Sequence, residues 1–249
     1  MKEQKKFGLL GKNISYSFSR TYFTDKFSKL QLNTYTYENF DIPSIEDFPL
    51  ILDKEIEYIQ GINVTIPYKE EVIQYMDEMD VDAARIGAVN TIKVLEGGLL
   101  KGYNTDSYGF EKALKPLLHD DVTGALILGT GGASKAIAFV LQKLKIPFLF
   151  VSRNPKNEHT LNYEDLDEIS IKNNKLIINC TPLGTHPNID ECPPIPYQFL
   201  TKKHILFDLI YNPEVSTFLS KGKNKGASIK NGRQMLELQA DKSWEIWNS

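Results

Sequence analysis

Hydrophobic and polar residues alternate with two different periods along the chain, and this pattern predicts strands and helices in turn. Short apolar or alternating runs predict strands at 7–10, 34–40, 58–66, 125–129, 147–153, 175–180 and 204–210. Apolar residues at helical spacing predict helices at 20–32, 44–56, 68–79, 107–118, 133–145 and 232–248. Residues 88–94 and 99–104 flank Gly97-Gly98 and predict a hairpin. Strands that alternate with helices imply βαβ units around a mostly parallel sheet, so the expected fold class is α/β.

The composition narrows the class of protein. The 249 residues allow one large domain or two modest ones, and 41% hydrophobic with 24% charged residues is typical of a soluble globular protein. The net charge of −3 argues against a protein that mainly neutralises nucleic-acid phosphates. The apolar runs are shorter than the ~20 residues that span a bilayer, and the N-terminal run is too short for a signal peptide. We therefore expect a cytoplasmic protein without a nucleic-acid or membrane partner.

Cysteine and histidine are too few and too scattered for a disulfide scaffold or a zinc site. Cys180 ends an apolar run, where a reduced and packed thiol is expected. The four histidines form no cluster with zinc-ligand spacing. This pattern argues against a metal-dependent alcohol dehydrogenase and predicts no metal.

The most specific local signal is a glycine-rich turn between a buried strand and a helix. Residues 125–136 read ALILGTGGASKA. Gly129 permits a tight turn, and Gly131 lets the backbone approach a pyrophosphate that the helix N-terminus attracts. The third small residue of the fingerprint is Ser134, so the match is not strict, and a turn without a ligand is the alternative. The position between strand and helix favours a dinucleotide site.

The strand that follows indicates which cofactor binds. A site for NAD usually carries Asp or Glu about 20 residues after the glycines, where it binds the ribose 2′-hydroxyl. Here the strand ends in Ser152-Arg153-Asn154, and a guanidinium grips a 2′-phosphate that a carboxylate would repel. The sequence therefore predicts NADP, with a solvated arginine at a strand end as the alternative for Arg153.

Reduction of a ketone by hydride needs a proton donor for the developing alkoxide. Tyr22-x-x-x-Lys26 has the spacing of the short-chain dehydrogenase pair, but it lies far upstream of the glycine turn, so we reject it. Lys69 is the better candidate, because it falls in the first turn of the predicted helix 68–79. The helix dipole and partial burial would favour the neutral amine there.

Asp106 has two compatible interpretations. It either caps a helix that begins at Ser107 or pairs with Lys69, which it would orient while tuning its proton affinity. A flexible surface lysine is the alternative for Lys69.

Together these residues resemble the shikimate dehydrogenase family across nearly the whole chain. The resemblance rests on five motifs in the family's order, at 63–69, 87–91, 102–106, 129–134 and 231–240. It implies reduction of 3-dehydroshikimate to shikimate with NADPH, a step of chorismate and aromatic amino acid biosynthesis. It also implies a substrate domain, 1–101 completed by the C-terminal helix 231–249, and a Rossmann-like NADP-binding domain, 102–230, with a cleft between them.

The resemblance also assigns roles position by position. It implies Lys69 and Asp106 as the catalytic pair. It implies the following substrate contacts: Ser17, Ser19, Thr65, Asn90, Tyr211 and Gln239. It implies the following cofactor contacts: Gly129, Gly131, Gly132, Ala133, Ser134, Ser152, Arg153, Asn154 and Gly232. Without the resemblance, Ser19 would be expected to cap the helix at 20–32.

Several features leave alternatives open. The family usually has His, Pro and Asp where this chain has Tyr16, Arg20 and Asn231. A quinate/shikimate dehydrogenase that uses NAD or NADP is one alternative, and a folate-type dehydrogenase is another. A non-catalytic nucleotide-binding regulator on the same fold is the third, although such a module has no need of Lys69 and Asp106. We expect a small-molecule substrate, and a monomer or a homodimer.

Overall fold

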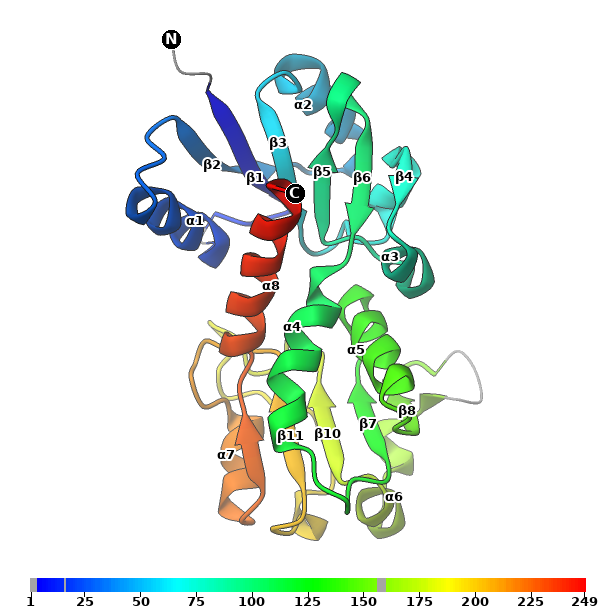
Figure 1. Cartoon of the computed structure of the whole chain (residues 1–249). Helices are drawn as coiled ribbons and strands as arrows, with labels where there is room; N and C mark the ends of the chain where they lie inside the picture. Colours follow the sequence, from blue (N-terminus) through cyan, green and yellow to red (C-terminus); the bar gives the residue numbers. More distant parts are fainter. Residues whose placement is uncertain (1–3, 16, 156–159) are drawn as a thin grey trace. The chain divides into compact units, whose positions relative to one another are not determined.

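The structure, a computed structural model, describes residues 4–15, 17–155 and 160–249, so Tyr16 lies outside the described residues. It confirms the α/β class, with helices packed around two six-stranded sheets (Figure 1). The chain divides into two compact units. The first unit contains Met1–Thr105 and Ala240–Ser249, and the second contains Asp106–Gln239. These boundaries differ from the predicted ones after residues 101 and 230, and the roles predicted for the two domains stay predictions.

The first unit is built on a mixed sheet with the strand order β2-β1-β3-β5-β6-β4. Its strands are β1 Lys5–Gly11, β2 Tyr35–Asp41, β3 Ile59–Val64, β4 Glu78–Met79, β5 Thr91–Val94 and β6 Leu100–Tyr103. β1 is parallel to β2 and β3, whereas β5 is antiparallel to β3 and β6, which confirms the predicted hairpin. Its helices are α1 Phe18–Lys29, α2 Phe48–Glu55, α3 Val81–Ile86 and the end of α8 Arg233–Trp247. Short 3₁₀ segments lie at Ile45–Asp47, Glu71–Tyr75 and Glu96–Gly98.

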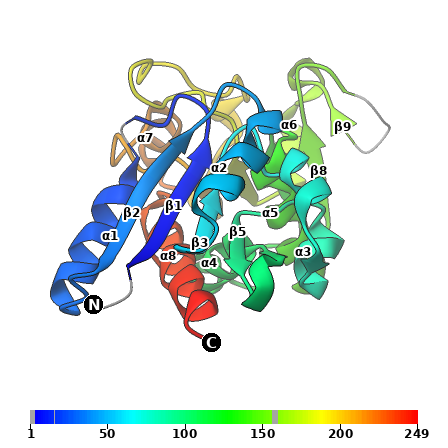
Figure 2. The ribbon, with the colours of Figure 1, turned by 90° about the horizontal axis from the view of Figure 1, so that it is seen from above.

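Apolar side chains cover both faces of this sheet. Phe7 and Leu9 of β1 pack with Phe23 of α1, whereas Leu10 belongs to the cluster that contains Phe48 of α2. Successive side chains of a strand point to opposite faces, so α1 and α2 must cover different sides. Figure 2 shows the two helices on opposite sides of β1 and β2.

The end of α8 is anchored in the first unit by an aromatic ring and a hydroxyl. The ring of Trp247 lies 5.0 Å from the ring of Phe7. A Cβ at Gly61 would lie 2.1 Å from Trp247, so β3 needs a glycine at this close approach. The Oγ of Ser243 accepts a hydrogen bond of 2.9 Å from Nδ2 of Asn63. Residues distant in sequence therefore complete one core.

The prediction of a helix at 68–79 is wrong. Residues 66–70 form turns, Glu71–Tyr75 is a 3₁₀ helix, and β4 pairs in parallel with β6. The N–H of Asp77 donates to the carbonyl of Leu100 at 2.9 Å, so the backbone bonds across the sheet instead of along a helix. The apolar residues of this segment all pack against the core, Tyr68 and Val72 buried and the others partly buried. Their spacing therefore suits a helix as well as the observed turn and strand.

All strands of the second unit are parallel, in the order β12-β11-β10-β7-β8-β9, which confirms the predicted mostly parallel sheet. They are β7 Ala125–Leu128, β8 Phe148–Val151, β9 Thr160–Leu161, β10 Leu176–Asn179, β11 Ile205–Asp208 and β12 Ser228–Lys230. The helices are α4 Thr105–Leu114, α5 Gly132–Lys143, α6 Glu168–Asn173, α7 Thr217–Asn224 and the first part of α8, with 3₁₀ segments at Lys115–Leu117, Tyr163–Asp165 and Tyr197–Phe199. This strand order is that of the doubly wound dinucleotide-binding fold.

Helices cover both faces of the parallel sheet, which explains the continuous apolar runs of its strands. Ala125 and Ile127 of β7 face the cluster that contains Leu141 of α5, and Leu126 faces the cluster that contains Phe218 of α7. Among the helices of the described residues, none combines the length and the apolar character that crossing a membrane requires.

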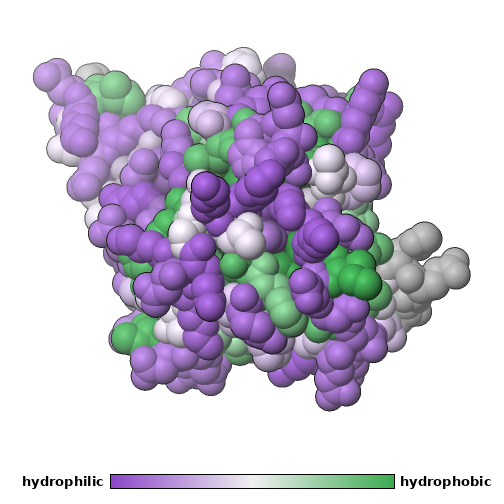
Figure 3. Space-filling model, turned by 90° about the horizontal axis from the view of Figure 1, so that it is seen from below, coloured by the Kyte–Doolittle hydropathy of each residue, from purple (hydrophilic) through white to green (hydrophobic). Residues whose placement is uncertain are grey.

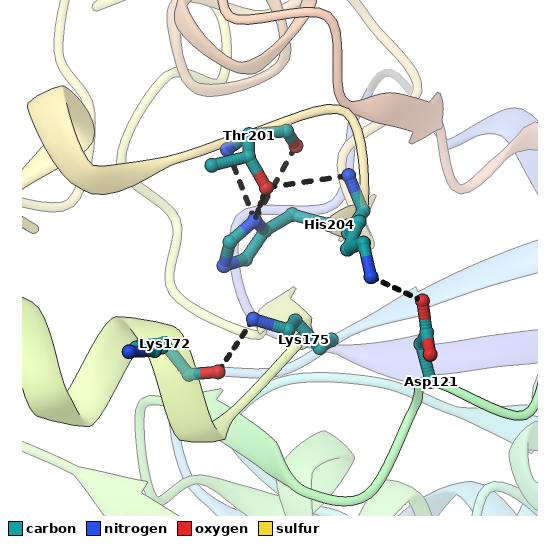
Figure 4. A network of polar contacts seen from close by, with 6 residues as sticks. Asp121, Lys172, Lys175, Thr201 and His204 are labelled. Atoms are coloured by element: carbon teal, nitrogen blue, oxygen red, sulfur yellow. Dashed lines mark hydrogen bonds and ion pairs between the residues drawn. The ribbon is translucent and has the colours of Figure 1, made fainter.

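A buried histidine lies at the amino end of β11. Seen from below, the face of the second unit at the amino ends of its strands is mostly hydrophilic, with apolar residues scattered in small groups (Figure 3). Beneath it, His204 is 1% exposed. The N–H of Thr201 donates to Nδ1 of His204 at 3.0 Å (Figure 4). Nε2 therefore carries the proton and donates it to the carbonyl of Ile171 at 3.0 Å. Burial holds the pKa of His204 below its ordinary 6.5, and the nearby Lys175 ammonium acts in the same direction.

We expect His204 to destabilise the fold as the pH falls. Its pKa is lower in the folded than in the unfolded protein, so below pH 6.5 the unfolded chain binds more protons and stability decreases. His204→Gln removes this titration. The difference in free energy of unfolding between the natural protein and the variant should shrink between about pH 7.5 and about pH 5.5, measured by urea titration. A difference that is independent of pH would contradict the expectation.

Candidate active site

The glycine-rich turn lies between β7 and α5, as the sequence predicts. Gly129 has φ +100°, a conformation that favours glycine, and a Cβ there would lie 3.1 Å from Cγ2 of Thr181. Gly131 is the N-cap of α5, which begins at Gly132. The strand order reverses between β7 and β10, so the turn lies at the switch point where sheets of this type bind dinucleotides.

The space beside Gly131 fits a phosphate group. A Cβ at Gly131 would meet nothing within 4 Å, and its φ of −81° suits any residue, so the fold itself does not require glycine there. The first amides of α5, which include Gly132 and Ala133, have no partner within their helix and present donors to an anion. Ser134 shapes the turn, because its Oγ donates to the carbonyl of Gly131 at 2.7 Å and the residue is 1% exposed.

Gly131→Ala should separate cofactor binding from folding. The added methyl group enters open space, so the free energy of unfolding should change by no more than about 1 kcal/mol. The same methyl group would occupy the position from which the backbone meets a pyrophosphate, so the Kd for NADPH should rise about tenfold or more. Calorimetric titration and thermal unfolding of the same sample measure both quantities. An unchanged Kd for NADPH would mean that the pyrophosphate does not bind at this turn.

The segment after β8 lies beside the glycine turn, because β8 pairs with β7. The N–H of Asn154 reaches Oγ of Ser152 at 3.3 Å, which closes a small turn around Arg153. Arg153 is exposed, so its guanidinium is accessible to an anionic ligand. A Rossmann-type site that lacks an acid here fits a ribose 2′-phosphate, and the role of these residues stays a prediction.

Gly232 is required by a close backbone contact. A Cβ there would lie 2.1 Å from the carbonyl oxygen of Leu209, in the segment that also carries Tyr211. Tyr211 is half-buried, and burial raises its pKa above the ordinary value despite the opposing charge of Arg233. Asn231 accepts a hydrogen bond of 3.3 Å from the N–H of Arg233, so its side chain caps the start of α8.

Three polar residues that the sequence analysis does not assign lie at the carboxyl ends of β10 and β11. Asn179 and Asp208 are fully buried, and Nδ2 of Asn179 donates to Oδ1 of Asp208 at 3.0 Å. Thr181 donates to Oδ1 of Asn179 through its Oγ1 at 2.7 Å. The sequence offers one signal for Asn179 and Asp208, because each is the polar residue that ends an apolar run, LIIN and ILFD.

Ser17 and Ser19 begin α1 in the first unit. Ser17 is the N-cap, and its Oγ is buried without a hydrogen-bond partner within the described part of the chain. Ser19 lies in the first turn, so the expectation that it caps the helix is wrong, and its hydroxyl bonds that of Tyr37. A buried hydroxyl without a partner is unfavourable unless a ligand completes it, so Ser17 fits a carboxylate.

Thr65 and Asn90 follow β3 and precede β5, two neighbouring strands. The N–H of Thr65 donates to the carbonyl of Leu10 at 2.9 Å. Asn90 is 3% exposed, its Oδ1 accepts from the N–H of Thr105 at 2.7 Å, and its Nδ2 donates to Oγ1 of Thr105 at 3.0 Å. The side chain of Asn90 is therefore held in one orientation by the protein itself.

Lys69 lies in the turn that follows β3, not in the first turn of a helix, so the argument from a helix dipole is wrong. The carbonyl of Lys69 accepts from the N–H of Val89 at 2.7 Å. Its neighbour Tyr68 is 2% exposed and donates from its hydroxyl to the carbonyl of Ile42 at 2.8 Å. The backbone that carries the Lys69 amine is thus fixed on both sides.

Asp106 is the second residue of α4, which begins at Thr105, so the prediction of a cap before a helix at Ser107 is wrong. Gln239 lies on α8, which approaches α4 closely at Gly109. A Cβ at Gly109 would lie 2.5 Å from the carbonyl of Met235 and 3.2 Å from Cβ of Gln239. The two helices run side by side (Figure 1), so Asp106 and Gln239 lie on adjacent elements of the second unit.

Tyr22 and Lys26, the pair that the sequence analysis rejects as catalytic, have a structural role instead. The hydroxyl of Tyr22 donates to Asp241 at 2.7 Å, and Lys26 forms an ion pair with the same carboxylate. These contacts fasten α1 to the end of α8 within the first unit. Lys69 belongs to the first unit and Asp106 to the second, so their pairing stays a prediction.

The fold and the glycine turn define a class, the proteins that combine a doubly wound dinucleotide-binding unit with a second unit. Residues 9–92 match the family model of the shikimate dehydrogenase substrate binding domain. The chain is 38% identical over 257 residues to a shikimate dehydrogenase (NADP(+)) of Methanococcus maripaludis, covering 96% of this chain and 90% of that relative. The corresponding enzyme of Clostridium beijerinckii is 37% identical over 250 residues, with 97% and 91% covered.

A solved structure agrees with these relatives. Shikimate 5-dehydrogenase from Thermus thermophilus, in complex with NADP(H) and shikimate, superposes with a TM-score of 0.85 at 30% identity and covers 98% of this chain and 93% of that chain. The chain belongs to the shikimate dehydrogenase family.

Proposed function

We propose that this protein is an NADP-dependent shikimate dehydrogenase, which reduces 3-dehydroshikimate to shikimate in the route to chorismate and the aromatic amino acids. The observation that carries the proposal is the similarity, over nearly the full length of both chains, to shikimate dehydrogenases (NADP(+)). The parallel sheet with a glycine turn at its switch point supports the proposal, because sheets of this type bind dinucleotides at that position.

The residues around the switch point fit the cofactor. The turn from Gly129 to Ser134 would hold the pyrophosphate with its backbone amides, and Ser152, Arg153 and Asn154 would hold the 2′-phosphate. Gly232 would face the nicotinamide with its backbone. Bound NADPH supplies the hydride for the ketone carbon.

Lys69 would donate the proton that the ketone oxygen needs as it becomes a hydroxyl. An ammonium group is a suitable donor, since it offers three N–H groups and its positive charge stabilises the negative charge that develops on the oxygen. The carboxylate of Asp106 would orient this ammonium and accept one of its hydrogen bonds. In the reverse direction Lys69, as a neutral amine, would remove the proton.

Polar side chains of both units would recognise the substrate. Ser17 and Ser19 would bind the carboxylate, and the buried Oγ of Ser17 supports this assignment because a ligand oxygen would complete it. The ring hydroxyls would bind the following residues: Thr65, Asn90, Tyr211 and Gln239. Such groups discriminate strongly, because a substrate without the matching hydroxyl leaves them unpaired.

The decisive experiment follows absorbance at the nicotinamide band with purified protein, shikimate and NADP⁺. We expect turnover with this pair, and slower turnover when NAD⁺ replaces NADP⁺ or quinate replaces shikimate. Preferred turnover of quinate would favour the quinate/shikimate alternative. NADP⁺ binding without turnover of either substrate would favour a non-catalytic regulator. A cytoplasmic location and a monomer or homodimer stay predictions, which cell fractionation and light scattering test.

A further inference from the structure

The carboxylate of Asp208 is buried at the end of β11 and accepts hydrogen bonds from three different segments. Its Oδ1 accepts from Nδ2 of Asn179 and from the N–H of Ile210, both at 3.0 Å. Its Oδ2 accepts from the hydroxyl of Ser216, which in turn accepts from the N–H of Leu219 and caps α7. Asp208 is 0% exposed, so none of these bonds is weakened by competing water.

The first branch of this network reaches the loop after β10. Asn179, held by Asp208, accepts from both the N–H and the Oγ1 of Thr181, at 3.0 and 2.7 Å. The N–H of Leu183 donates to the same Oγ1 at 3.3 Å. Thr181 also lies beside the glycine turn, because a Cβ at Gly129 would lie 3.1 Å from its methyl group. The amide of Asn179 therefore sets the shape of the loop that borders the glycine turn.

The second branch reaches the segment after β11. The bond from Ile210 to Asp208 closes a turn directly before Tyr211. The carbonyl of Ile210 accepts from the N–H of Gly232 at 3.0 Å, and Gly232 packs against the carbonyl of Leu209. One carboxylate thus holds the backbone of two segments at the same edge of the sheet.

The strand order indicates which part of the cofactor these segments border. A dinucleotide extends across the switch point with its pyrophosphate at the first turn, here the one after β7. The adenosine half would lie over β8, where Arg153 would take the 2′-phosphate, so the nicotinamide half would lie over β10 and β11. The two segments that Asp208 holds follow those two strands.

We propose that Asp208 is a positioning residue for the nicotinamide half of NADPH, acting through Asn179 and Thr181 on one side and through Ile210 and Gly232 on the other. This inference rests on the proposed function, because it takes the cofactor to be NADPH. Asp208 itself touches neither cofactor nor substrate in this scheme.

The charge of Asp208 matters for the choice of conditions. Burial raises the pKa of Asp208 to about 6, although the bonds from Ser216, Ile210 and Asn179 oppose this. The titratable groups near it are the thiol of Cys180 and the hydroxyl of Tyr197, and burial raises the pKa of each above its ordinary value. Both stay neutral at pH 7.5. Experiments at about pH 7.5 therefore examine the ionised carboxylate alone.

The test compares two ligands that share the adenosine half, NADPH and 2′,5′-ADP, which lacks the nicotinamide. Asp208→Ala should raise the Kd for NADPH at least about tenfold and leave the Kd for 2′,5′-ADP within about twofold, measured by calorimetry. Asp208→Asn should restore most of the NADPH affinity, because its Oδ1 still accepts from Asn179 and Ile210. Thr181→Val, which removes one hydroxyl and should fold normally, should show the same selective loss as Asp208→Ala.

His204→Gln is the matched control, because it changes a buried polar residue at the opposite end of the same strand. It should change stability and leave both Kd values at their natural levels. Equal weakening of both ligands in Asp208→Ala and Thr181→Val, or no weakening in either, would overturn the positioning role. Failure of the natural protein to bind NADPH would instead overturn the proposed function, so the two failures are distinguishable.

Discussion

Lys69→Ala lowers kcat for shikimate oxidation by roughly 10²–10⁴-fold and leaves the KM for shikimate within a few-fold, if Lys69 is the acid/base group. The alkoxide and hydroxyl forms of the reacting oxygen differ by one proton, and without the amine that proton must move to water. Binding depends mainly on the carboxylate and the ring hydroxyls, which other residues would hold. Steady-state rates at saturating NADP⁺ measure the two parameters separately.

The matched control is Lys54→Ala, which removes an exposed lysine of α2 and should leave both parameters unchanged. Asp106→Asn should also lower kcat, by a smaller factor, because the amide still accepts one hydrogen bond but carries no charge. Nearly unchanged turnover in Lys69→Ala would exclude Lys69 as the proton donor. A rise in KM without loss of kcat would make it a binding residue instead.

Arg153→Ala raises the KM for NADPH by about 10–100-fold and changes the KM for shikimate by less than about twofold. A hydrogen bond to a charged group contributes about 1.5–3 kcal/mol, which corresponds to this range of affinity. The exposed position of Arg153 after β8 places the expected effect toward the lower end, since solvent screens the charge.

NADH provides the control for Arg153 within the same protein, because it lacks the 2′-phosphate. The KM for NADH should be nearly the same in the natural protein and in Arg153→Ala, so the preference for NADPH over NADH should fall. An equal rise in KM for both cofactors would mean that Arg153 shapes the site without contacting the phosphate. An equal rise for NADPH and shikimate would remove its assigned role altogether.

Local patterns along the chain determined much of this protein. The run ALIL before Gly129 predicted a buried strand, the glycines predicted the turn, and the following apolar spacing predicted α5. The strand, the turn and the helix depend on interactions between residues close in sequence, or on burial, which shows directly in the spacing of apolar residues. The order of family motifs extended this local information to the whole chain.

Only the tertiary structure decided the features that depend on distant partners. Residues 68–79 have apolar spacing that suits a helix, but hydrogen bonds between β4 and β6 make part of the segment a strand. Asp208 and Asn179 are only polar ends of apolar runs in the sequence, and their partnership exists because β10 and β11 are neighbours in the sheet. Sequence spacing carries no record of which strands pair, so backbone pairing and buried polar contacts between separate strands had to come from the fold.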